Sequence, residues 1–518
     1  MQYIVTAEEM KCYENFVLEK VGISSLLLME RAAMEMADVL MRYRKKNTRI
    51  LAVAGTGNNG GDALAVGRIL AQRGAEVCFY MPGDCRKMSR ETRKQASVLR
   101  KYGFSILRKL PEAEYDIVID GLFGTGLSRE VAGVYKRAVD EINGLGKKGA
   151  LVASVDIPSG VCADTGGILG CCVQADITVT FEYAKLGHYL YPGREAAGKL
   201  FVRGIGLDRR AFSLKQPSCF SFYGQELREL LPQRDPAGHK GVFGRVALIA
   251  GSKDMAGAAV LCGRSVLRTG AGMVKIITPD TNRGIIQRAL PEAMLYTYRG
   301  IADPEKVEET LSWADVIVAG PGMGKGKAAE ELILQALTRR RQKDGTDGAQ
   351  GHLPPMVLDA DALNLIAEKE KLRDAVCAYE RRRIILTPHP GEFTRLSGLS
   401  MEEYKQNRQR AVRELAQRFG CIVAGKDAVT MAAAAQGGPV FLNLTGNDGM
   451  ATAGSGDVLA GMIGGLLAQK LAPYEAACLG ICLHGSCGDA AAAAKNRYSV
   501  TASDLIEEIC HVFNVREG

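Results

Sequence analysis

Two glycine-rich motifs lie in opposite halves of the chain, and each combines a flexible backbone with side-chain oxygens. The first is Gly55-Thr-Gly-Asn-Asn-Gly-Gly-Asp62, and the second runs from Gly446 to Asp457. Each is expected to lead into a helix N-terminus, where free N–H groups and the helix dipole favour an anionic ligand. Neither ends in the Lys-Ser/Thr pair of a Walker loop. Two unlike phosphate-binding motifs in one chain predict two active sites that act on related nucleotides.

Further polar loops follow the apolar runs of the first half. Two of them are Asp120-Gly-Leu-Phe-Gly-Thr-Gly-Leu127 and Asp156-Ile-Pro-Ser-Gly160, and a third contributes Lys185. Any one of these loops could be only a tight turn, because Asp-Gly and Pro-Ser-Gly are common turn formers. Four such loops at the strand ends of one sheet favour a site. Their oxygen donors, without His or Cys, suit a hard cation or a sugar-phosphate better than zinc.

The second half offers the residues that a phosphoryl transfer needs. The segment Asn447–Asp457 can hold a transferring phosphoryl group with backbone N–H donors, and Asp457 can deprotonate the attacking hydroxyl. Taken alone, this segment could be a connector capped by an aspartate. Combined with Asp359, Asp361 and the segment His389-Pro-Gly-Glu392, it predicts a catalytic site. A histidine between two prolines could also pack in a rigid turn, but we expect His389 to hydrogen-bond substrate.

Alternating strands and helices must position these motifs. The first half begins with one predicted helical segment, Ala7–Tyr43, and continues with strands and helices at Ile50–Ala54, Asp62–Arg73, Glu76–Tyr80, Arg90–Tyr102, Tyr115–Asp120, Val134–Ile142, Leu151–Asp156, Ile177–Phe181 and Leu200–Arg203. The pattern restarts with Arg245–Ala250, Ala256–Arg268, Met273–Thr278, Ala314–Ala319, Met356–Leu358, Arg383–Leu386 and Cys421–Val423. Such alternation predicts the α/β class, with parallel sheets that bind ligands beyond the carboxyl ends of their strands.

The predicted organisation is two domains: residues 1–215 as a Rossmann-like doubly wound sheet, a linker over 216–235, and residues 236–518 as a second α/β domain. A polar tract, Arg339–Gly351, is expected to be an exposed loop.

A net charge of +8 spread over 518 residues, with 6% aromatic residues, predicts a slightly basic enzyme without a nucleic-acid partner. The sequence shows no signal peptide and no apolar stretch judged long enough to span a bilayer. We therefore expect a cytoplasmic protein with no membrane partner, in homo-oligomeric form.

The first-half motifs resemble the N-terminal YjeF-type domain, the NAD(P)H-hydrate epimerase, which interconverts the R and S forms of hydrated NADH or NADPH. This chain departs from that pattern at Ala63 and at Glu30-Arg-Ala-Ala33. From about Lys240 to Leu505 the motifs resemble the ribokinase-like domain of ADP/ATP-dependent NAD(P)H-hydrate dehydratase. That family phosphorylates the hydroxyl of the hydrate and eliminates phosphate, which regenerates NAD(P)H. The resemblance implies a ribokinase-like α/β/α fold for the second domain.

The resemblance also implies roles for particular residues. In the first domain the implied substrate contacts are Asn58, Asn59, Gly60, Gly61, Asp62, Gly124, Thr125, Gly126, Leu127, Ser128, Arg129, Glu130 and Asp156. A potassium ion would be held by Asn59, Asp120 and Ser159. In the second domain the implied contacts to the hydrated nucleotide are Gly272, Gly324, His389 and Asp457. The adenine nucleotide, with Mg²⁺, would be held by Lys426, Asp427, Ala428, Val429, Thr430 and Gly456.

These observations predict a bifunctional repair enzyme for NADHX and NADPHX, the hydrated forms of NADH and NADPH. Asp156 is the expected acid–base residue of epimerisation, and Asp457 is the expected base of an ADP-dependent dehydration of the S form. ADP is preferred to ATP by resemblance alone. Two alternatives remain: a small-molecule kinase for a vitamin precursor, and a first domain that serves as a non-catalytic binding scaffold.

Overall fold

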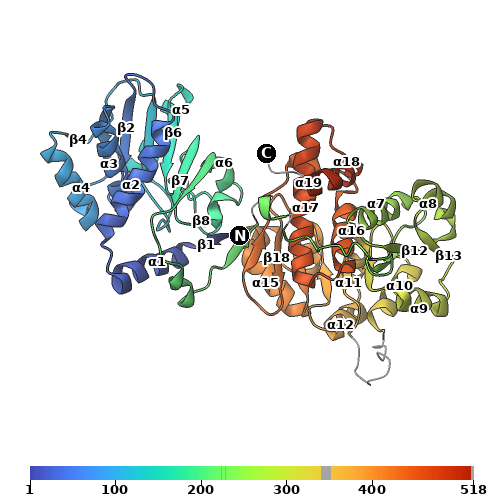
Figure 1. The fold of residues 1–518 in the computed structure, drawn as a ribbon. Coiled ribbons are helices and arrows are strands. Elements are labelled where there is room, and N and C mark those ends of the chain that lie inside the picture. Colours follow the sequence, from blue (N-terminus) through green and yellow to red (C-terminus); the bar gives the residue numbers. More distant parts are fainter. Residues whose placement is uncertain (223, 228, 340–351, 515–518) are drawn as a thin grey trace. The chain divides into compact units, whose positions relative to one another are not determined.

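A computed structural model describes residues 1–222, 224–227, 229–339 and 352–514. The chain divides into two compact units, Tyr3–Cys219 and Phe220–Gly518, the second of which also includes Met1–Gln2 (Figure 1). The division falls inside the segment predicted as a linker. That segment is not featureless, because Cys219–Ser221 form strand β10. The predicted loop at Arg339–Gly351 lies, from residue 340 onward, outside the described residues.

The N-terminal unit is built on a parallel sheet with the strand order β4-β3-β2-β5-β6-β7-β9. Its strands are β2 (Arg49–Ala54), β3 (Glu76–Tyr80), β4 (Ile106–Leu107), β5 (Ile117–Gly121), β6 (Leu151–Val155), β7 (Ile177–Phe181) and β9 (Lys199–Arg203). The chain runs outward from β2 in one direction and from β5 in the other. This doubly wound order places a topological switch point between β2 and β5.

Alternation along the strands of this sheet builds two hydrophobic cores. Ile50 and Ala52 of β2 join one core, while Leu51 and Val53 join the other. The first core is covered by α2 (Ser25–Met41), α3 (Asn58–Gln72) and α4 (Arg90–Lys101), and the second by α5 (Gly133–Lys147). The remaining short elements are β1 (Gln2–Val5), which pairs with β8 (Ala184–Lys185), and α6 (Gly193–Ala197).

The prediction of one helical segment over Ala7–Tyr43 is wrong. Helix α1 (Ala7–Phe16) passes into a π-helical turn at Val17–Val21, and Gly22 then ends it with a φ of 85°. Because glycine alone adopts this left-handed conformation at little cost, the chain turns there and α2 begins after a Ser24 cap.

The C-terminal unit repeats the same order of parallel strands, β13-β12-β11-β14-β15-β16-β17, and extends it with the antiparallel strands β18 and β19. These strands are β11 (Arg245–Ile249), β12 (Met273–Pro279), β13 (Met294–Tyr298), β14 (Val316–Ala319), β15 (Met356–Leu358), β16 (Ile384–Leu386), β17 (Ile422–Gly425), β18 (Met431–Ala434) and β19 (Val440–Leu442). Its switch point lies between β11 and β14.

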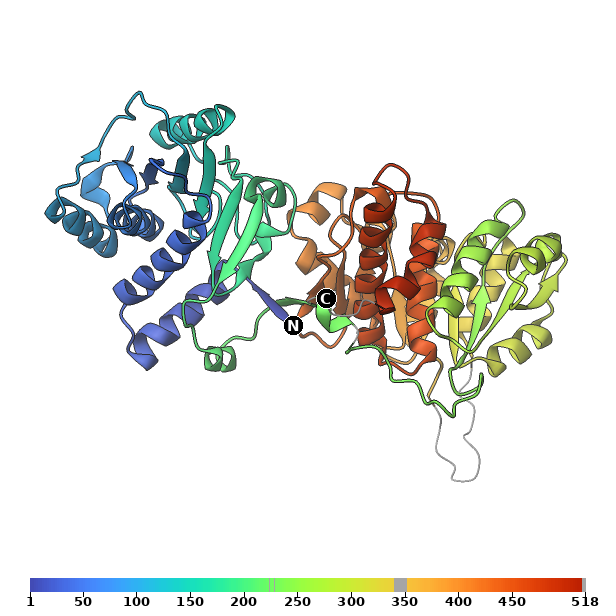
Figure 2. The ribbon, with the colours of Figure 1, turned by 45° about the horizontal axis from the view of Figure 1, so that its top comes forward.

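Helices lie on both faces of this second sheet (Figure 2). They are α7 (Ala256–Arg268), α8 (Arg283–Ala289), α9 (Pro304–Trp313), α10 (Lys327–Leu337), α11 (Asp361–Glu368), α12 (Glu370–Ala378), α13 (Pro390–Ser397), α14 (Met401–Gln406), α15 (Arg408–Phe419), α16 (Ser455–Ala468), α17 (Pro473–Ala494), α18 (Ala502–Glu507) and α19 (Ile509–Asn514). Helix α16 packs between α7 and α17. Among the described helices, α17 alone is long and apolar enough to cross a membrane by length and composition, and 67% of its most apolar window is buried inside the protein.

Candidate active sites

A cavity of about 540 Å³ lies at the switch point of the N-terminal sheet. Its lining comes from the loops after β2 and β5, from Asp156 after β6, and from α1 and α2. The predicted substrate residues that line it are Asn58, Asn59, Asp62, Gly124, Thr125, Gly126, Leu127, Ser128, Arg129 and Asp156. The fold therefore brings together residues that are far apart in the sequence.

Three of the predicted substrate residues, Gly60, Gly61 and Glu130, are not part of this lining. Helix α3 begins at Asn58, four residues before the predicted start, so both glycines belong to its first turn. A Cβ on Gly60 would lie 1.9 Å from the carbonyl oxygen of Gly55, which shows that close backbone packing requires glycine there.

Asp156 is held at the cavity by a buried ion pair. Lys185 Nζ lies 2.5 Å from Asp156 Oδ1 and has no exposed side-chain surface, while the Asp156 side chain is 16% exposed. Thr180 Oγ1 donates a hydrogen bond to the same oxygen at 2.8 Å. Burial raises the pKa of Asp156, but the Lys185 ammonium and the Thr180 hydrogen bond outweigh it, so the pKa falls below its ordinary value. Asp156 is therefore a carboxylate at neutral pH.

His188 fixes the backbone of Asp156. Its Nδ1 accepts a hydrogen bond from the Lys185 backbone N–H at 3.0 Å, so its Nε2 carries the proton and donates to the Asp156 carbonyl oxygen at 2.8 Å. Burial, followed by the charge of Lys185, lowers the pKa of His188 to about 4. A neutral imidazole thus supports Asp156, whose φ of 64° is a strained value for a residue other than glycine.

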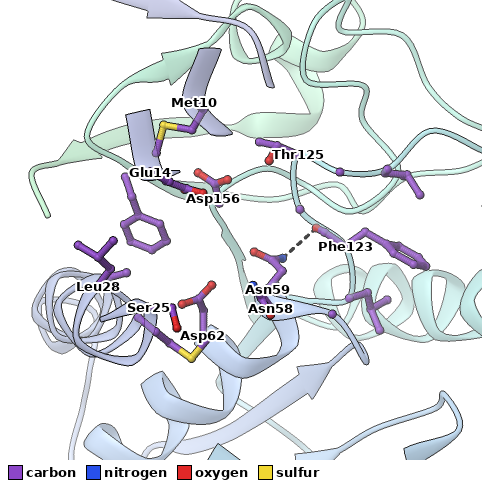
Figure 3. A pocket seen from close by; sticks show the side chains of 18 of the residues that line it. Met10, Glu14, Ser25, Leu28, Asn58, Asn59, Asp62, Phe123, Thr125 and Asp156 are labelled. Atoms are coloured by element: carbon purple, nitrogen blue, oxygen red, sulfur yellow. Dashed lines mark hydrogen bonds between the residues drawn. The ribbon is translucent and has the colours of Figure 1, made fainter. Parts of the chain in front are cut away.

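Two further carboxyl groups, those of Glu14 and Asp62, enter the same cavity (Figure 3). Burial raises the pKa of both, and the nearby charge of Asp156 raises each further. Glu14 could not be found from a motif, because it belongs to α1 and no motif surrounds it. The i, i+4 spacing of Met10, Glu14 and Leu18, a carboxyl in an apolar stripe, is the signal that could have revealed it.

Oxygen donors gather around Asp120, which is fully buried. Its carboxyl group accepts hydrogen bonds from Ser159 Oγ at 2.6 Å, from the Ser159 N–H at 2.9 Å and from Ser154 Oγ at 2.8 Å. Ser159 Oγ also lies 3.2 Å from the Phe123 carbonyl oxygen, to which Asn59 Nδ2 donates at 2.8 Å. No basic side chain of the described residues pairs with Asp120, and burial raises its pKa. Carboxylate, hydroxyl and carbonyl oxygens of this kind fit a hard monovalent cation.

In the C-terminal unit, an ion pair lies at the carboxyl ends of β15 and β17. Lys426 Nζ lies 2.6 Å from Asp359 Oδ1, and the Asp359 side chain is 1% exposed. A Cβ on Gly456 would lie 3.2 Å from Lys426 Nζ, so the first turn of α16 rests on this pair. Asp457 is the next residue of that turn, and burial followed by the charge of Asp359 raises its pKa to about 7. Of the predicted residues, Lys426, Gly456 and Asp457 are thus brought together.

The loops after β14 and β15 also meet at this edge. Asp361 Oδ2 accepts a hydrogen bond from the Gly324 N–H at 2.8 Å, which joins a predicted substrate residue to the aspartate segment. Between the two aspartates, Ala360 has a φ of 49°. Strain of this kind persists where the surrounding structure fixes the backbone, as at binding sites.

His389 has a structural role at the start of a helix. It caps α13, where its Nδ1 accepts from the Gly391 N–H at 3.0 Å, and Glu392 Oε2 accepts from the His389 N–H at 2.9 Å. Burial and the charge of Lys426 lower its pKa, so the ring is neutral and Nε2 carries the proton. This Nε2 lies 3.3 Å from Glu392 Oε1, and the side chain is half-exposed. Its predicted hydrogen bond to substrate stays a prediction.

The structure separates Gly272 from the other predicted substrate residues. Gly272 precedes β12 at the amino end of the sheet, and a Cβ there would lie 1.8 Å from the carbonyl oxygen of Lys240. The glycine serves this close packing and lies at the opposite edge of the sheet from Asp457, and its predicted contact with substrate stays a prediction. The predicted nucleotide segment, Lys426, Asp427, Ala428, Val429 and Thr430, forms the connection between β17 and β18. Val429 is fully buried, whereas Asp427 and Ala428 are exposed.

One supporting residue, His484 of α17, belongs to no motif and was missed by the sequence analysis. Its Nε2 lies 2.9 Å from the Ser455 carbonyl oxygen and 3.2 Å from Ser455 Oγ. Burial lowers the pKa of His484 to about 4, so a neutral ring secures the first turn of α16.

Two α/β units, each with carboxylates at the carboxyl ends of its own parallel strands, define a two-site enzyme. Family models match both parts: one described as YjeF-related protein N-terminus over residues 25–187, and one described as NAD(P)H-hydrate dehydratase over residues 246–511. A bifunctional NAD(P)H-hydrate repair enzyme of Moorella thermoacetica is 34% identical over 98% of this chain and 96% of its own length. The Escherichia coli relative of the same description is 32% identical over 98% and 93%. The chain belongs to the family of bifunctional NAD(P)H-hydrate repair enzymes.

Solved structures resemble the C-terminal part. A hypothetical protein of Streptococcus mutans, 26% identical, covers 57% of this chain and 98% of its own, with a TM-score of 0.50. An ADP/ATP-dependent NAD(P)H-hydrate dehydratase of Bacillus subtilis, co-crystallised with ATP/Mg²⁺, is 30% identical over 56% and 96%, with a TM-score of 0.47. The prediction of an epimerase joined to a dehydratase is confirmed by the family. The cytoplasmic location and the homo-oligomeric state stay predictions.

Proposed function

We propose that the two activities are divided between the units: the N-terminal cavity epimerises hydrated NADH or NADPH, and the C-terminal site dehydrates the S form with ADP, giving AMP and phosphate. The observation that carries this division is that each sheet has its own carboxylates, Asp156 in one unit and Asp457 in the other, at the carboxyl ends of its own strands. Neither a vitamin-precursor kinase nor a first domain acting as a scaffold accounts for a family match across both parts.

In the N-terminal cavity, epimerisation requires the hydrated carbon to lose and regain its hydroxyl through a ring that becomes cationic. The carboxylate of Asp156 stabilises this positive charge and exchanges protons with the hydroxyl. Lys185 keeps Asp156 ionised, and His188 keeps its backbone in place. Asn59, Asp120 and Ser159, together with the Phe123 carbonyl group, would hold a potassium ion that adds positive charge beside the substrate.

In the C-terminal site, dehydration begins with phosphoryl transfer to the hydroxyl of the hydrate. Asp457 takes the proton of that hydroxyl, while N–H groups at the start of α16 hold the phosphoryl oxygens. Mg²⁺ bound with the nucleotide would neutralise part of the phosphate charge. Elimination of phosphate from the ring then leaves NAD(P)H. Lys426, paired with Asp359 beneath Gly456, places a positive charge beside the transferred group.

Recovery of NADH absorbance tests the central proposal. A mixture of both hydrate epimers is incubated with the protein, Mg²⁺, and either ADP or ATP. With ADP we expect all of the hydrate to return to NADH, because epimerisation feeds the stereospecific dehydration. Recovery of the S fraction alone would remove the epimerase assignment, and no recovery with either nucleotide would contradict the whole proposal. Faster recovery with ATP would overturn the preference for ADP.

Removal of potassium is expected to slow epimerisation and to lower the melting temperature of the N-terminal unit. Replacement of KCl by choline chloride at equal ionic strength isolates the ion from general screening. In an Asp120→Asn variant the potassium dependence of both quantities should be lost. An unchanged melting temperature and rate in choline would show that this site holds no cation.

A further inference from the structure

Helix α1 directs one carboxyl group into the N-terminal cavity. Met10, Glu14 and Leu18 are spaced by four residues, so they share a face, and all three line the cavity. The start of the helix is fixed by a capping box in which Thr6 and Glu9 exchange hydrogen bonds. Tyr13 is fully buried, and its hydroxyl donates to the Lys215 carbonyl oxygen at 2.9 Å. The segment that carries Glu14 is therefore held in place by its cap and by its buried neighbour.

Within the described residues, the Glu14 carboxyl has no hydrogen bond and no ion pair. Figure 3 shows it directed toward Asp156, with Asp62 entering the cavity from α3. The charged groups that face it are those two carboxyls and the Lys185 ammonium, which is bonded to Asp156. His188, beside Lys185, is neutral.

The charges of this cavity do not balance if every carboxyl is ionised. Three carboxyls surround one buried cation, with which Asp156 is in direct contact, and the other basic residue of the lining, Arg129, is exposed. Like charges brought together in a partly buried site raise one another's pKa. Burial, followed by the charge of Asp156, accordingly raises the pKa of Glu14. The site thus holds a carboxyl with a raised pKa next to an ionised one, which is the arrangement that acid–base catalysis requires.

We propose that Glu14 is a catalytic acid–base residue of the epimerase site, an inference that rests on the proposed function and deepens it. The Glu14 carboxyl gives its proton to the hydroxyl of the hydrated ring. The C–O bond breaks with its electron pair on oxygen, water forms, and the ring nitrogen supplies the pair for a C=N⁺ bond beside Asp156. Water then adds to the opposite face of the ring, and its proton returns to the Glu14–Asp156 pair. The cycle needs no co-reactant.

The test is a Glu14→Gln variant of the full chain, with Glu14→Asp as the conservative variant and Glu19→Gln, exposed in the following turn, as a matched control. Three quantities are measured: the epimerisation rate from the pure R form, incorporation of ¹⁸O from labelled water into the hydrate, and the dehydration rate of the pure S form. We expect Glu14→Gln to slow epimerisation and ¹⁸O incorporation by about 100-fold with little change in KM. Glu14→Asp should restore part of the rate, and Glu19→Gln should have no effect.

The pH profile separates catalysis from packing. In the wild type, epimerisation should slow on the alkaline side as Glu14 loses its proton, and Glu14→Gln should remove this decline. A Glu14→Gln variant with an unchanged melting temperature, full rate and the same alkaline decline overturns the inference. Loss of the decline in Asp62→Asn instead assigns the acid to Asp62 and also overturns it. The wild-type epimerisation rate is measured before the variants are compared. If the wild type does not epimerise, the proposed function itself fails.

Discussion

Replacement of Asp457 by Asn is expected to abolish dehydration while leaving epimerisation at its original rate. The substitution keeps the shape of the side chain but removes the base, so the rate of dehydration should fall by about 10²- to 10⁴-fold. The amide side chain would still occupy the first turn of α16, and the N–H groups that hold phosphate would remain. Nucleotide binding should therefore persist, which thermal stabilisation by ADP measures.

The matched control for this variant is Asp448→Asn, because Asp448 belongs to the same glycine-rich segment but has a side chain that is 77% exposed, paired with Arg497. This control should dehydrate at the wild-type rate. Dehydration by Asp457→Asn at more than about a tenth of the wild-type rate would show that another group takes the proton. Loss of ADP stabilisation as well would point to a binding role for Asp457 rather than a catalytic one.

The pH dependence of dehydration follows from the same residue. The pKa of Asp457 is raised to about 7, and only the ionised form acts as a base. The wild-type rate should therefore rise as the pH increases through about 7 and level off above it. Burial raises the pKa of Glu392 to about 7 as well, and the charges of Asp359 and Lys426 act on both groups. A Glu392→Gln variant that retains the rise would assign it to Asp457.

Much of the fold could be predicted because short apolar runs are bounded by residues that end strands. The predicted strand Ile50–Ala54 and the observed β2 differ by one residue, and the polar residues after β2 and β5 lie at one edge, as parallel strands require. The break at Gly22 was missed because apolar periodicity continues on both sides of it. The packing role of Gly272 could not be predicted, because a glycine needed for backbone packing looks, in the sequence, like one that contacts a ligand.

The electrostatics of the sites could not be predicted from local sequence. Lys185 pairs with Asp156 from 29 residues away, and Lys426 with Asp359 from 67 residues away, so only the folded chain shows which carboxylates are neutralised. The pKa of Glu14 depends in turn on the charges of Asp156 and Lys185. Motifs therefore identified the edges of the sheets at which chemistry occurs, while the assignment of acids and bases needed the three-dimensional charge balance.

Replacement of Asp156 by Asn is expected to stop epimerisation and, separately, to destabilise the N-terminal unit. Asn tolerates the φ of 64° better than Ala does, which makes it the less disruptive choice. Without the carboxylate the rate should fall by about 10²- to 10⁴-fold. Lys185, with no exposed side-chain surface, would be left as an uncompensated buried charge, and such losses cost about 3–5 kcal/mol. Dehydration of the pure S form, in the other unit, should continue.

A double variant, Asp156→Asn with Lys185→Met, separates the two effects. Removal of both charges should restore most of the stability, because no unpaired ammonium remains, yet epimerisation should stay absent.

The wild-type pair also predicts a pH effect: the pKa of Asp156 lies below its ordinary value, so the stabilisation by the pair is present above that value and is lost as the pH falls. The double variant should not lose stability in this way as the pH falls. The control is Asp140→Asn, which breaks an exposed pair with Lys136; this variant should still lose stability at low pH and should epimerise at the full rate. Recovery of epimerisation in the double variant would show that Asp156 serves only to neutralise Lys185, and the acid–base assignment would then pass to the remaining carboxyls of the cavity.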